Sequence, residues 1–450
     1  MTRAILYWRR FGFVALSKVA GKRLLRPLFA YAIGPVGRRL VGPILSRQFE
    51  KSRTGIQLYL KKKTFLPGEE IPVYVHSPER DYRLEIVHFG THDAVVFEGQ
   101  ERPAKRQGTS PLAFRNGAGW EETDRLDTTS LAPGVYAIRG SDYQNISEAV
   151  FCMRPPGVEE KISILLNTNT WAAYNAWGGS SLYSNSFGFF FSEWASLLRP
   201  NPSESPALTT SHLFGGELHL IRWLHNNNLA FTCLTDSDLH NGGEVLGKSK
   251  VLILNTHPEY WSAAMYDHLE DFLNSGGSLL SLAGNGLWWK VEMGHTAVFV
   301  DKSRRVHNQG QWKNLGRPAS SVLGSLYDGI GYGTFAPYEI VRADHWIFEG
   351  LNVRDGDSFG DLSLVTSDSD SSGASGWELD HVDEFSPANG LVVAKGQNPG
   401  GGADVFIYEH PGGGTVLSFG SISSASAVPL DSVMAGMVTN FLKYTSGAGK

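Results

Sequence analysis

The sequence contains very little cysteine and no long uninterrupted run of apolar residues. Cys152 and Cys233 are the only cysteines among 450 residues, so a disulfide framework is excluded. Neither stands in a nucleophile-elbow pattern, which favours two buried structural thiols and a reducing, cytoplasmic location. Because no apolar run reaches about 18 residues, we expect no membrane-spanning helix.

Charge is distributed unevenly along the chain. The formal net charge is -5, yet residues 1–54 hold twelve lysines and arginines and a single acid, Glu50. The short apolar stretches of this basic tail do not form a signal peptide. Two alternatives stay open for it: an amphipathic helix that contacts a membrane surface or another subunit, or a loosely docked arm. Since the basic excess is confined to the tail, we expect no nucleic-acid partner.

Short alternating runs predict β-strands over residues 55–156. Residues 71–75 and 83–89 alternate between apolar and polar side chains, and turn-forming segments such as Leu66-Pro67-Gly68 separate the runs. About 100 residues of this kind are typical of a β-sandwich. We therefore predict a β-sandwich-like domain here, ending in the linker Arg154-Pro155-Pro156-Gly157.

Over residues 157–450, buried-strand runs alternate with helical spacing. Gly276-Gly277 predicts an αL cap at the end of one helix. The alternation predicts a parallel sheet with helices on both faces, in which ligands bind outside the carboxyl ends of the strands. The expected strands are 162–166, 231–234, 251–254, 279–282, 391–394, 405–408 and 416–419, and the expected helices are 217–225, 261–273 and 429–444.

Three segments rich in polar and aromatic residues follow three of these strands. They read NTNTWAAYNAWGG over 167–179, NTHPEYW over 255–261 and AGNG over 283–286. Because the carboxyl ends of parallel strands meet at one edge, the three segments should lie close together. Amides and aromatic rings at this density indicate a pocket wall, with a turn-rich loop of packed rings as the alternative.

The second and third segments contain residues suited to chemistry. His257 lies where an imidazole can reach a substrate or water. Pro258 suits the first position of the following helix and Glu259 its first turn, so this acid also has a purely structural explanation. Asn285, between two glycines after a strand, occupies a nucleophile-elbow position but can only orient or stabilise a polarised carbonyl. A plain turn is the alternative there.

The strings NTNTWAAYNAWGG, THPEYWS and GNGLWW occur in this order, and with them residues 55–450 resemble the large (beta) subunit of N,N-dimethylformamidase. The resemblance implies that residues 157–450 have a flavodoxin-like, class I glutamine-amidotransferase-like fold without the cysteine nucleophile. It implies an amidohydrolase that acts on the linear C–N bond of a small amide, within an oligomer. A separate small helical subunit accompanies the large one in that family, and the tail 1–54 is a candidate to pack where such a partner would.

The resemblance also implies a mononuclear ferric ion, Fe(III), bound by two tyrosines and one glutamate. Glu259 matches the glutamate and Tyr174 one tyrosine, while Tyr136 in Pro133-Gly134-Val135-Tyr136 is the best match for the other. Such hard oxygen ligands suit a hard Lewis acid that polarises an amide carbonyl and activates water. The residues that match others around the family's site are His257, as proton relay, Asn285 and Glu378, and Trp171, Trp177 and Trp288 are expected to form an apolar wall.

Two further functions stay open. A non-catalytic module can use the same aromatic cleft to hold a ligand or a partner. The third reading is a cysteine-dependent amidotransferase with Cys233 as the nucleophile.

Overall fold

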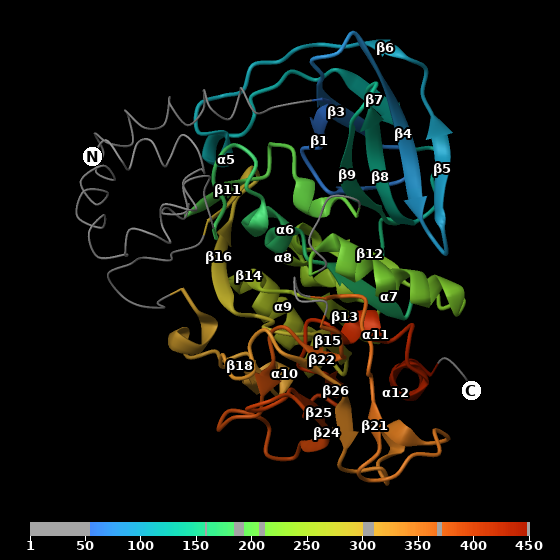
Figure 1. Ribbon diagram of the computed structural model, residues 1–450, viewed down its shortest axis with the longest axis vertical. Helices are drawn as coiled ribbons and strands as arrows, with labels where there is room; N and C mark the ends of the chain where they lie inside the picture. Colours follow the sequence, from blue (N-terminus) through green and yellow to red (C-terminus); the bar gives the residue numbers. More distant parts are fainter. Residues whose placement is uncertain are drawn as a thin grey trace, which may run out of the picture.

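The fold is described from a computed structural model of the chain (Figure 1). It describes residues 55–157, 160–183, 193–206, 212–299, 310–366 and 371–447, so the expectations for the tail 1–54 lie outside the described residues. Figure 1 shows a β-rich part at the top and a mixed α/β part below it. Within the described ranges, no helix is long and apolar enough to cross a membrane.

The β-rich part consists of two sheets around one core. One sheet has the strand order β1-β3-β7, and the other has the order β2-β9-β8-β4-β5 with β6 beside β4. The strands predicted at 71–75 and 83–89 are present as β3 and β4. The elements are β1 Gln57–Tyr59, β2 Thr64–Phe65, β3 Glu70–His76, β4 Asp81–Phe89, β5 Asp93–Glu98, β6 Arg102–Pro103, α5 Ala113–Asn116, β7 Asp124–Asp127, β8 Gly134–Ser141 and β9 Ile146–Met153.

Strands β8 and β9 of the larger sheet are buried on both faces over most of their length, whereas β5 is exposed, and this sheet joins the two parts of the protein. Successive residues of a strand point to opposite faces. In β9, Phe151 enters the core between the two sheets, whereas Val150 and Cys152 enter a second core shared with the α/β part. The two parts therefore meet across a continuous apolar contact.

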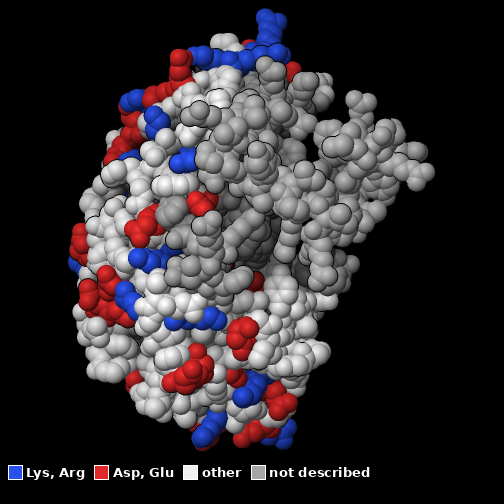
Figure 2. All heavy atoms as spheres, turned by 90° about the vertical axis from the view of Figure 1, so that its left-hand side faces the viewer, with Lys and Arg blue, Asp and Glu red and all other residues white. Residues whose placement is uncertain are grey.

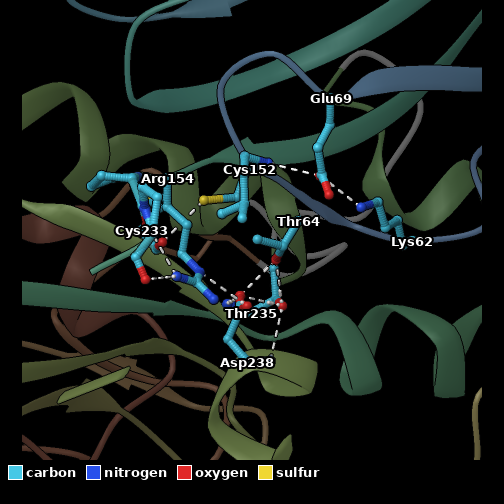
Figure 3. A network of polar contacts seen from close by, with 11 residues as sticks. Lys62, Thr64, Glu69, Cys152, Arg154, Cys233, Thr235 and Asp238 are labelled. Carbon is cyan, nitrogen blue, oxygen red and sulfur yellow. Dashed lines mark hydrogen bonds and ion pairs between the residues drawn. The ribbon is translucent and has the colours of Figure 1, made fainter. Parts of the chain in front are cut away.

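A polar network lies beside this contact (Figure 3). The carboxylate of Asp238 accepts hydrogen bonds from Thr64 Oγ1 at 2.6 Å and from Arg154 Nε at 3.1 Å, so it binds the β-rich part on both of its oxygens. The Cys152 thiol donates to the carbonyl oxygen of Cys233 at 3.0 Å. Both cysteines are free and buried, as predicted for structural thiols.

The α/β part is built on a nine-stranded sheet of order β12-β10-β13-β15-β26-β25-β24-β20-β21. The first five strands are parallel, as predicted from the alternation of strands and helices, and the remaining four continue the sheet in antiparallel fashion. These strands are β10 Ile162–Leu166, β12 Thr232–Thr235, β13 Val251–Thr256, β15 Ser278–Ala283, β20 Tyr338–Ile340, β21 Ser358–Phe359, β24 Leu391–Gly396, β25 Asp404–Glu409 and β26 Thr415–Ser418.

Helices cover both faces of this sheet. In β13, Val251 and Ile253 pack with α7, α11 and α12, whereas Leu252 and Leu254 pack with α8, α9 and α10. Both side-chain sets of the strand are apolar because both are buried. The helices are α6 Thr168–Tyr174, α7 Phe214–Asn226, α8 Asp236–Asn241, α9 Ala263–Asn274, α10 Ser320–Leu323, α11 Ser424–Ala427 and α12 Ser432–Ser446.

Smaller elements surround the carboxyl ends of the parallel strands. A four-stranded sheet has the order β11-β17-β16-β14, and two short pairs are β18 with β23 and β19 with β22. Figure 2 shows acidic and basic side chains interspersed over the described part of one face. The remaining elements are β11 Trp194–Ser196, η1 Pro202–Glu204, η2 Gly243–Leu246, β14 Tyr260–Ser262, β16 Trp289–Met293, β17 Ala297–Phe299, η3 Trp312–Leu315, β18 Leu326–Tyr327, β19 Phe335–Ala336, η4 Trp346–Phe348, β22 Ser375–Gly376 and β23 Asp380–His381.

The predicted start of α9 was wrong, whereas its predicted end is confirmed. Pro258 and Glu259 precede a short strand, and the helix begins only after Ser262, whose side chain caps the backbone N–H of Met265 at 3.2 Å. At the other end Gly276 has φ +89°, the left-handed conformation of an αL cap. Glu259 is therefore not a first-turn acid of a helix.

Glu217 of α7 joins the helix to the ends of two parallel strands. Its carboxylate accepts hydrogen bonds from Trp171 Nε1 at 2.6 Å and from the backbone N–H of Asn167 at 3.3 Å. Its carbonyl oxygen accepts a bond from Asn255 Nδ2 at 3.0 Å. Asn167 follows β10 and Asn255 lies near the end of β13, so Glu217 fixes the two strand ends relative to each other.

Burial raises the pKa of Glu217 to about 8, because the hydrogen bonds from Trp171 and Asn167 offset only part of the desolvation penalty. An unfolded glutamate ionises near pH ~4.3. Between these two pKa values, the folded protein therefore holds a proton on Glu217 that the unfolded chain releases. The contribution of this proton to the free energy of unfolding is complete below the pKa of the unfolded glutamate, and it is lost as the pH rises through about 8.

The free energy of unfolding of the wild type should fall between about pH 5 and pH 8. We expect this fall to be smaller in Glu217→Gln, by up to about 1.4 kcal/mol per pH unit. Glutamine keeps the shape of the side chain but has no titrating proton. Urea unfolding across this pH range measures the slope. The surface substitution Glu384→Gln is the control and should follow the wild type. A slope that Glu217→Gln leaves unchanged would contradict the protonated state.

Candidate active site

The parallel strands place the three expected segments together at one edge of the sheet. Strand β10 connects to β12 on one side, whereas β13 connects to β15 on the other, so the strand order reverses between the neighbours β10 and β13. Such a reversal opens a crevice at the carboxyl ends. Tyr174 follows β10 by way of α6, His257 and Glu259 follow β13, and Asn285 follows β15.

Glu259 lies at the centre of the cluster and is almost completely buried. Tyr174 Oη donates to one carboxylate oxygen at 3.3 Å, and Tyr183 Oη donates to the other in a short hydrogen bond. The two tyrosine rings stack with their centroids 4.1 Å apart. The pKa of each tyrosine is raised well above its usual value, first by burial and then by the negative charge of Glu259. Both phenols therefore keep their protons while they face this carboxylate alone.

His257 connects this group to the third strand end. Its Nδ1 donates to the carbonyl oxygen of Gly284 at 3.0 Å. This bond fixes the ring with Nε2 3.0 Å from Glu259 Oε2 and 3.2 Å from Tyr174 Oη. Burial by itself would lower the pKa of His257, but the carboxylates of Glu259 and Glu378 raise it to about 9. A charged imidazolium is therefore paired with the buried glutamate.

Asn285 holds a second acidic pair. Its backbone N–H donates to Asp380 Oδ1 at 2.8 Å, and its Nδ2 donates to Glu378 Oε2, also at 2.8 Å. Glu378 Oε2 in turn lies 3.7 Å from His257 Nε2. Burial raises the pKa of Glu378, and it raises that of Asp380 to about 7. The Oδ1 atom of Asn285 is buried and has no hydrogen-bond partner within the described ranges.

Backbone strain is concentrated around the cluster. Four non-glycine residues with left-handed backbone angles adjoin it: Thr256 at φ +59°, Asn285 at +50°, Leu287 at +51° and Trp377 at +77°. For a β-branched or bulky residue such an angle is a true outlier, and each costs about 1–3 kcal/mol. Strain of this size persists where the surrounding structure imposes it, which is characteristic of functional sites. Asn285 is of a residue type that tolerates this region, so its angle fits both an elbow and a plain turn.

The structure does not bring Tyr136 to this cluster. Tyr136 is a residue of β8 in the β-rich part, where its hydroxyl donates to the carbonyl oxygen of Ala132 at 2.8 Å. Its ring stacks on Phe151 and contacts His88. A strand tyrosine that faces a sandwich core is held by that core, so Tyr136 is a packing residue here.

Tyr183 occupies the place expected for Tyr136, and sequence reasoning missed it. The glycine pair Gly178-Gly179 has φ +86° and +100°, which lets the chain reverse after α6. The backbone N–H of Leu182 then donates to the carbonyl oxygen of Ala173 at 2.9 Å, so Tyr183 returns to stack on Tyr174. The glycine pair was the signal in the sequence, because it marks a reversal directly after the aromatic segment.

A buried arginine holds this reversal. Arg199 donates to the carbonyl oxygens of Asn175, at 3.1 Å, and of Trp177. It is 2 % exposed, and burial lowers its pKa to about 9. At neutral pH it therefore remains a cation bonded to main-chain carbonyl groups, which fixes the loop between the two site tyrosines.

The expected tryptophan wall is not formed as a unit. Trp171 is a core residue bonded to Glu217, and Trp177 donates from Nε1 to Gln57 Oε1 in the β-rich part. Trp288 packs edge-on against Tyr327, whose pKa is raised by burial and then by the charge of Glu378. Only Trp288 of the three therefore lies on the side of the site residues.

Neither cysteine is part of the cluster. Cys233 lies in β12, buried against Cys152 of the β-rich part, where a side chain cannot attack a substrate at the strand ends. Burial raises the pKa of the Cys152 thiol well above its usual value. Two inert thiols do not support a cysteine-dependent amidotransferase.

The donor atoms of the cluster suit one class of metal. In the described part of the chain, no group of three or more His, Cys, Asp or Glu side chains is arranged to hold a metal ion. The oxygen donors that converge at Glu259 are the phenol oxygens of Tyr174 and Tyr183 together with its own carboxylate. Three oxygen donors fit a hard, highly charged cation.

Gly284 tests how tightly the strand ends are packed. An added Cβ would lie 2.5 Å from the carbonyl oxygen of Glu378 and 2.5 Å from the backbone nitrogen of Ile422. Since both are backbone atoms, we expect Gly284→Ala to lower the free energy of unfolding by about 1–3 kcal/mol. Urea unfolding measures this change. Gly108→Ala, where nothing lies within 4 Å, is the control. Equal stability of the two variants would show that the contact relaxes freely.

Residues 84–432 match the family described as N,N-dimethylformamidase beta subunit-like, C-terminal. Two relatives named N,N-dimethylformamidase beta subunit, from Alcaligenes sp and Paracoccus aminophilus, are each 27 % identical over an alignment of 258 residues, which covers 46 % of this chain. The match spans 33 % of each relative's length. Among solved structures, the mmIFT52 N-terminal domain matches 50 % of this chain and 88 % of that chain at 13 % sequence identity. Its TM-score of 0.30 is too low to indicate a shared fold. Because the family match covers most of the chain, this protein belongs to the N,N-dimethylformamidase beta subunit-like, C-terminal family.

Proposed function

We propose that this chain hydrolyses small amides at the cluster around Glu259, with a ferric ion bound by Tyr174, Tyr183 and Glu259. One observation carries the proposal. Both carboxylate oxygens of a buried glutamate are contacted by tyrosine hydroxyls, at the strand ends where α/β sheets bind ligands. The names of the relatives support the choice of an amide as substrate.

The protonation of the tyrosines favours a trivalent ion over a divalent one. Both phenols keep their protons beside Glu259, so a bound cation must be strong enough to displace them. Three protein ligands leave coordination positions for other molecules. A ferric ion held there supplies Lewis acidity, which polarises an amide carbonyl and makes water more acidic.

The remaining residues position the reactants and a proton. His257 has its Nδ1 committed to Gly284, so its Nε2 is the atom that faces the reacting groups and passes a proton toward the leaving amine. Asn285 has its Nδ2 committed to Glu378, so its buried Oδ1 is left to accept a hydrogen bond from substrate or water. Glu378 also lies beside His257, where it favours the charged imidazole.

The relationship to the beta subunits also underlies our expectations for the assembly and the fold. The relatives are named as beta subunits, so we expect this chain to work with further subunits or further copies of itself. A cytoplasmic location remains our expectation. The five parallel strands with helices on both faces support a flavodoxin-like, amidotransferase-like α/β fold. The match covers 33 % of the length of each relative. The activity of the relatives' whole chains is therefore a proposal for this chain.

The pair Tyr183→Phe and Tyr136→Phe tests the site directly, because each substitution removes one hydroxyl and keeps the ring. We expect the wild type to bind about one iron, to absorb visible light through tyrosinate-to-iron charge transfer and to release amine from N,N-dimethylformamide or a related formamide. Tyr183→Phe should lower hydrolysis at least ~100-fold, a loss of about 2.7 kcal/mol in transition-state stabilisation, and weaken the visible band. Metal content, absorption and amine release are measured on the same samples.

Tyr136→Phe is the matched control, because the Tyr136 hydroxyl donates to the carbonyl oxygen of Ala132 in the β-rich part, away from the cluster. We expect it to keep iron, colour and activity. Loss of activity in Tyr136→Phe with retention in Tyr183→Phe would reverse the ligand assignment. A wild type that stays colourless and inactive after iron reconstitution would overturn the proposed function and favour a non-catalytic binding module.

A further inference from the structure

His212 lies against the candidate site but makes none of the contacts described so far. It stands two residues before α7, and its ring is edge-on to Tyr174 with the centroids 4.9 Å apart. The ring centroid of His257 lies 5.8 Å away. His212 therefore lies directly against one site tyrosine and close to the site histidine.

The Nδ1 atom of His212 is an unused polar atom in the interior. The residue is 8 % exposed, and Nδ1 is buried with no hydrogen-bond partner among the residues that the structure describes. Buried polar atoms in native proteins nearly always have a partner, and exceptions call for a ligand or water. Around the cluster, Asn285 Oδ1 has the same property.

Trp377 holds the His212 ring from the other side. The two ring centroids lie 4.6 Å apart. Trp377 has φ +77°, a strained angle for a bulky residue, and it directly precedes Glu378. The peptide that directs Glu378 toward His257 therefore also places the Trp377 ring on His212. Because Tyr174 and Trp377 both contact the imidazole, its orientation is set before any ligand binds.

We propose that His212 binds the substrate, with its Nδ1 forming a hydrogen bond to the amide group of a molecule bound beside the Tyr174–His212–Trp377 rings. This role rests on the proposed function. A neutral imidazole nitrogen is suited to it because it can donate to the amide oxygen or accept from an amide N–H, according to the tautomer. His212 is then the polar group that orients the amide, and His257 remains the group that faces the leaving amine.

Two substitutions of His212 separate hydrogen bonding from packing. Phenylalanine keeps the ring against Tyr174 and Trp377 but has no polar atom. Asparagine carries a polar atom near the position of Nδ1 but lacks the ring. With N,N-dimethylformamide, formamide and N-methylformamide as probes, we expect His212→Phe to raise KM about 10-fold with a much smaller change in kcat. We expect His212→Asn to restore much of the wild-type KM.

Three further readouts identify a purely structural role. Iron content, the visible band and the melting temperature should be the same in wild type and His212→Phe. The exposed His92→Phe is the control and should behave as wild type throughout. If His212→Phe lost iron or colour, His212 would act through Tyr174, and the proposal would be overturned. It would equally be overturned if KM were unchanged in His212→Phe.

A binding measurement separates this proposal from the proposed function. If the wild type binds iron but hydrolyses none of the three formamides, the proposed function fails. The metal-free protein labelled with ¹⁵N-histidine is then titrated with formamide, and the His212 signals are assigned by their loss in His212→Phe. A shift of the Nδ1 signal on addition of formamide supports the contact without catalysis. Unchanged His212 signals at saturating formamide would overturn it.

Discussion

The carboxylate of Glu259 is the group on which the rest of the site depends. A buried carboxylate is tolerated only when charge and hydrogen bonds compensate for its lost hydration. Here Tyr174, Tyr183 and His257 supply that compensation. They come from different segments, so a single buried charge requires two strand ends and a reversed loop to meet at one point. Removing any one partner leaves the others around an undercompensated charge.

The architecture explains how these segments meet at such close quarters. Parallel strands place all their carboxyl ends at one edge, and the reversal of strand order between β10 and β13 opens that edge. Glu217 then bonds to both of these strand ends, to Asn167 through its carboxyl group and to Asn255 through its backbone carbonyl oxygen. Strain at Thr256, Asn285 and Trp377 is the consequence, because the side chains must turn inward over very short distances.

Sequence periodicity was sufficient to predict seven of the nine strands of the sheet, all except β20 and β21, and the edge at which the site lies. Buried parallel strands read as short apolar runs, and the polar segments after β10, β13 and β15 stood out against them. Tyr174, His257, Glu259, Asn285 and Glu378 lie together in the structure, as the resemblance implied. Their chemical roles remain predictions, because geometry alone does not measure them.

The errors have physical causes that periodicity cannot reveal. Pro258 suits a helix start, but Tyr260–Ser262 pairs with β16, and Ser262 caps the helix instead. Tyr136 was chosen as the best match to the second tyrosine that the resemblance implied, whereas the sandwich core holds it. Tyr183 was missed because its position depends on a reversal at two glycines and on one buried arginine, and neither leaves a repeating pattern in the sequence.

The protonation of Tyr174 and Tyr183 bears on which metal ion we propose for the cluster. To ionise either phenol would add a second negative charge beside Glu259 in a site from which water is excluded, so both pKa values are raised. Beyond the His257 imidazolium, an incoming cation can offset that charge, and its attraction for the oxygens grows with its own charge. Divalent ions bind well to carboxylates and imidazoles without this cost. The proposal of a trivalent ion rests on this comparison, because a site of two phenols and one carboxylate would retain its protons against a weaker cation.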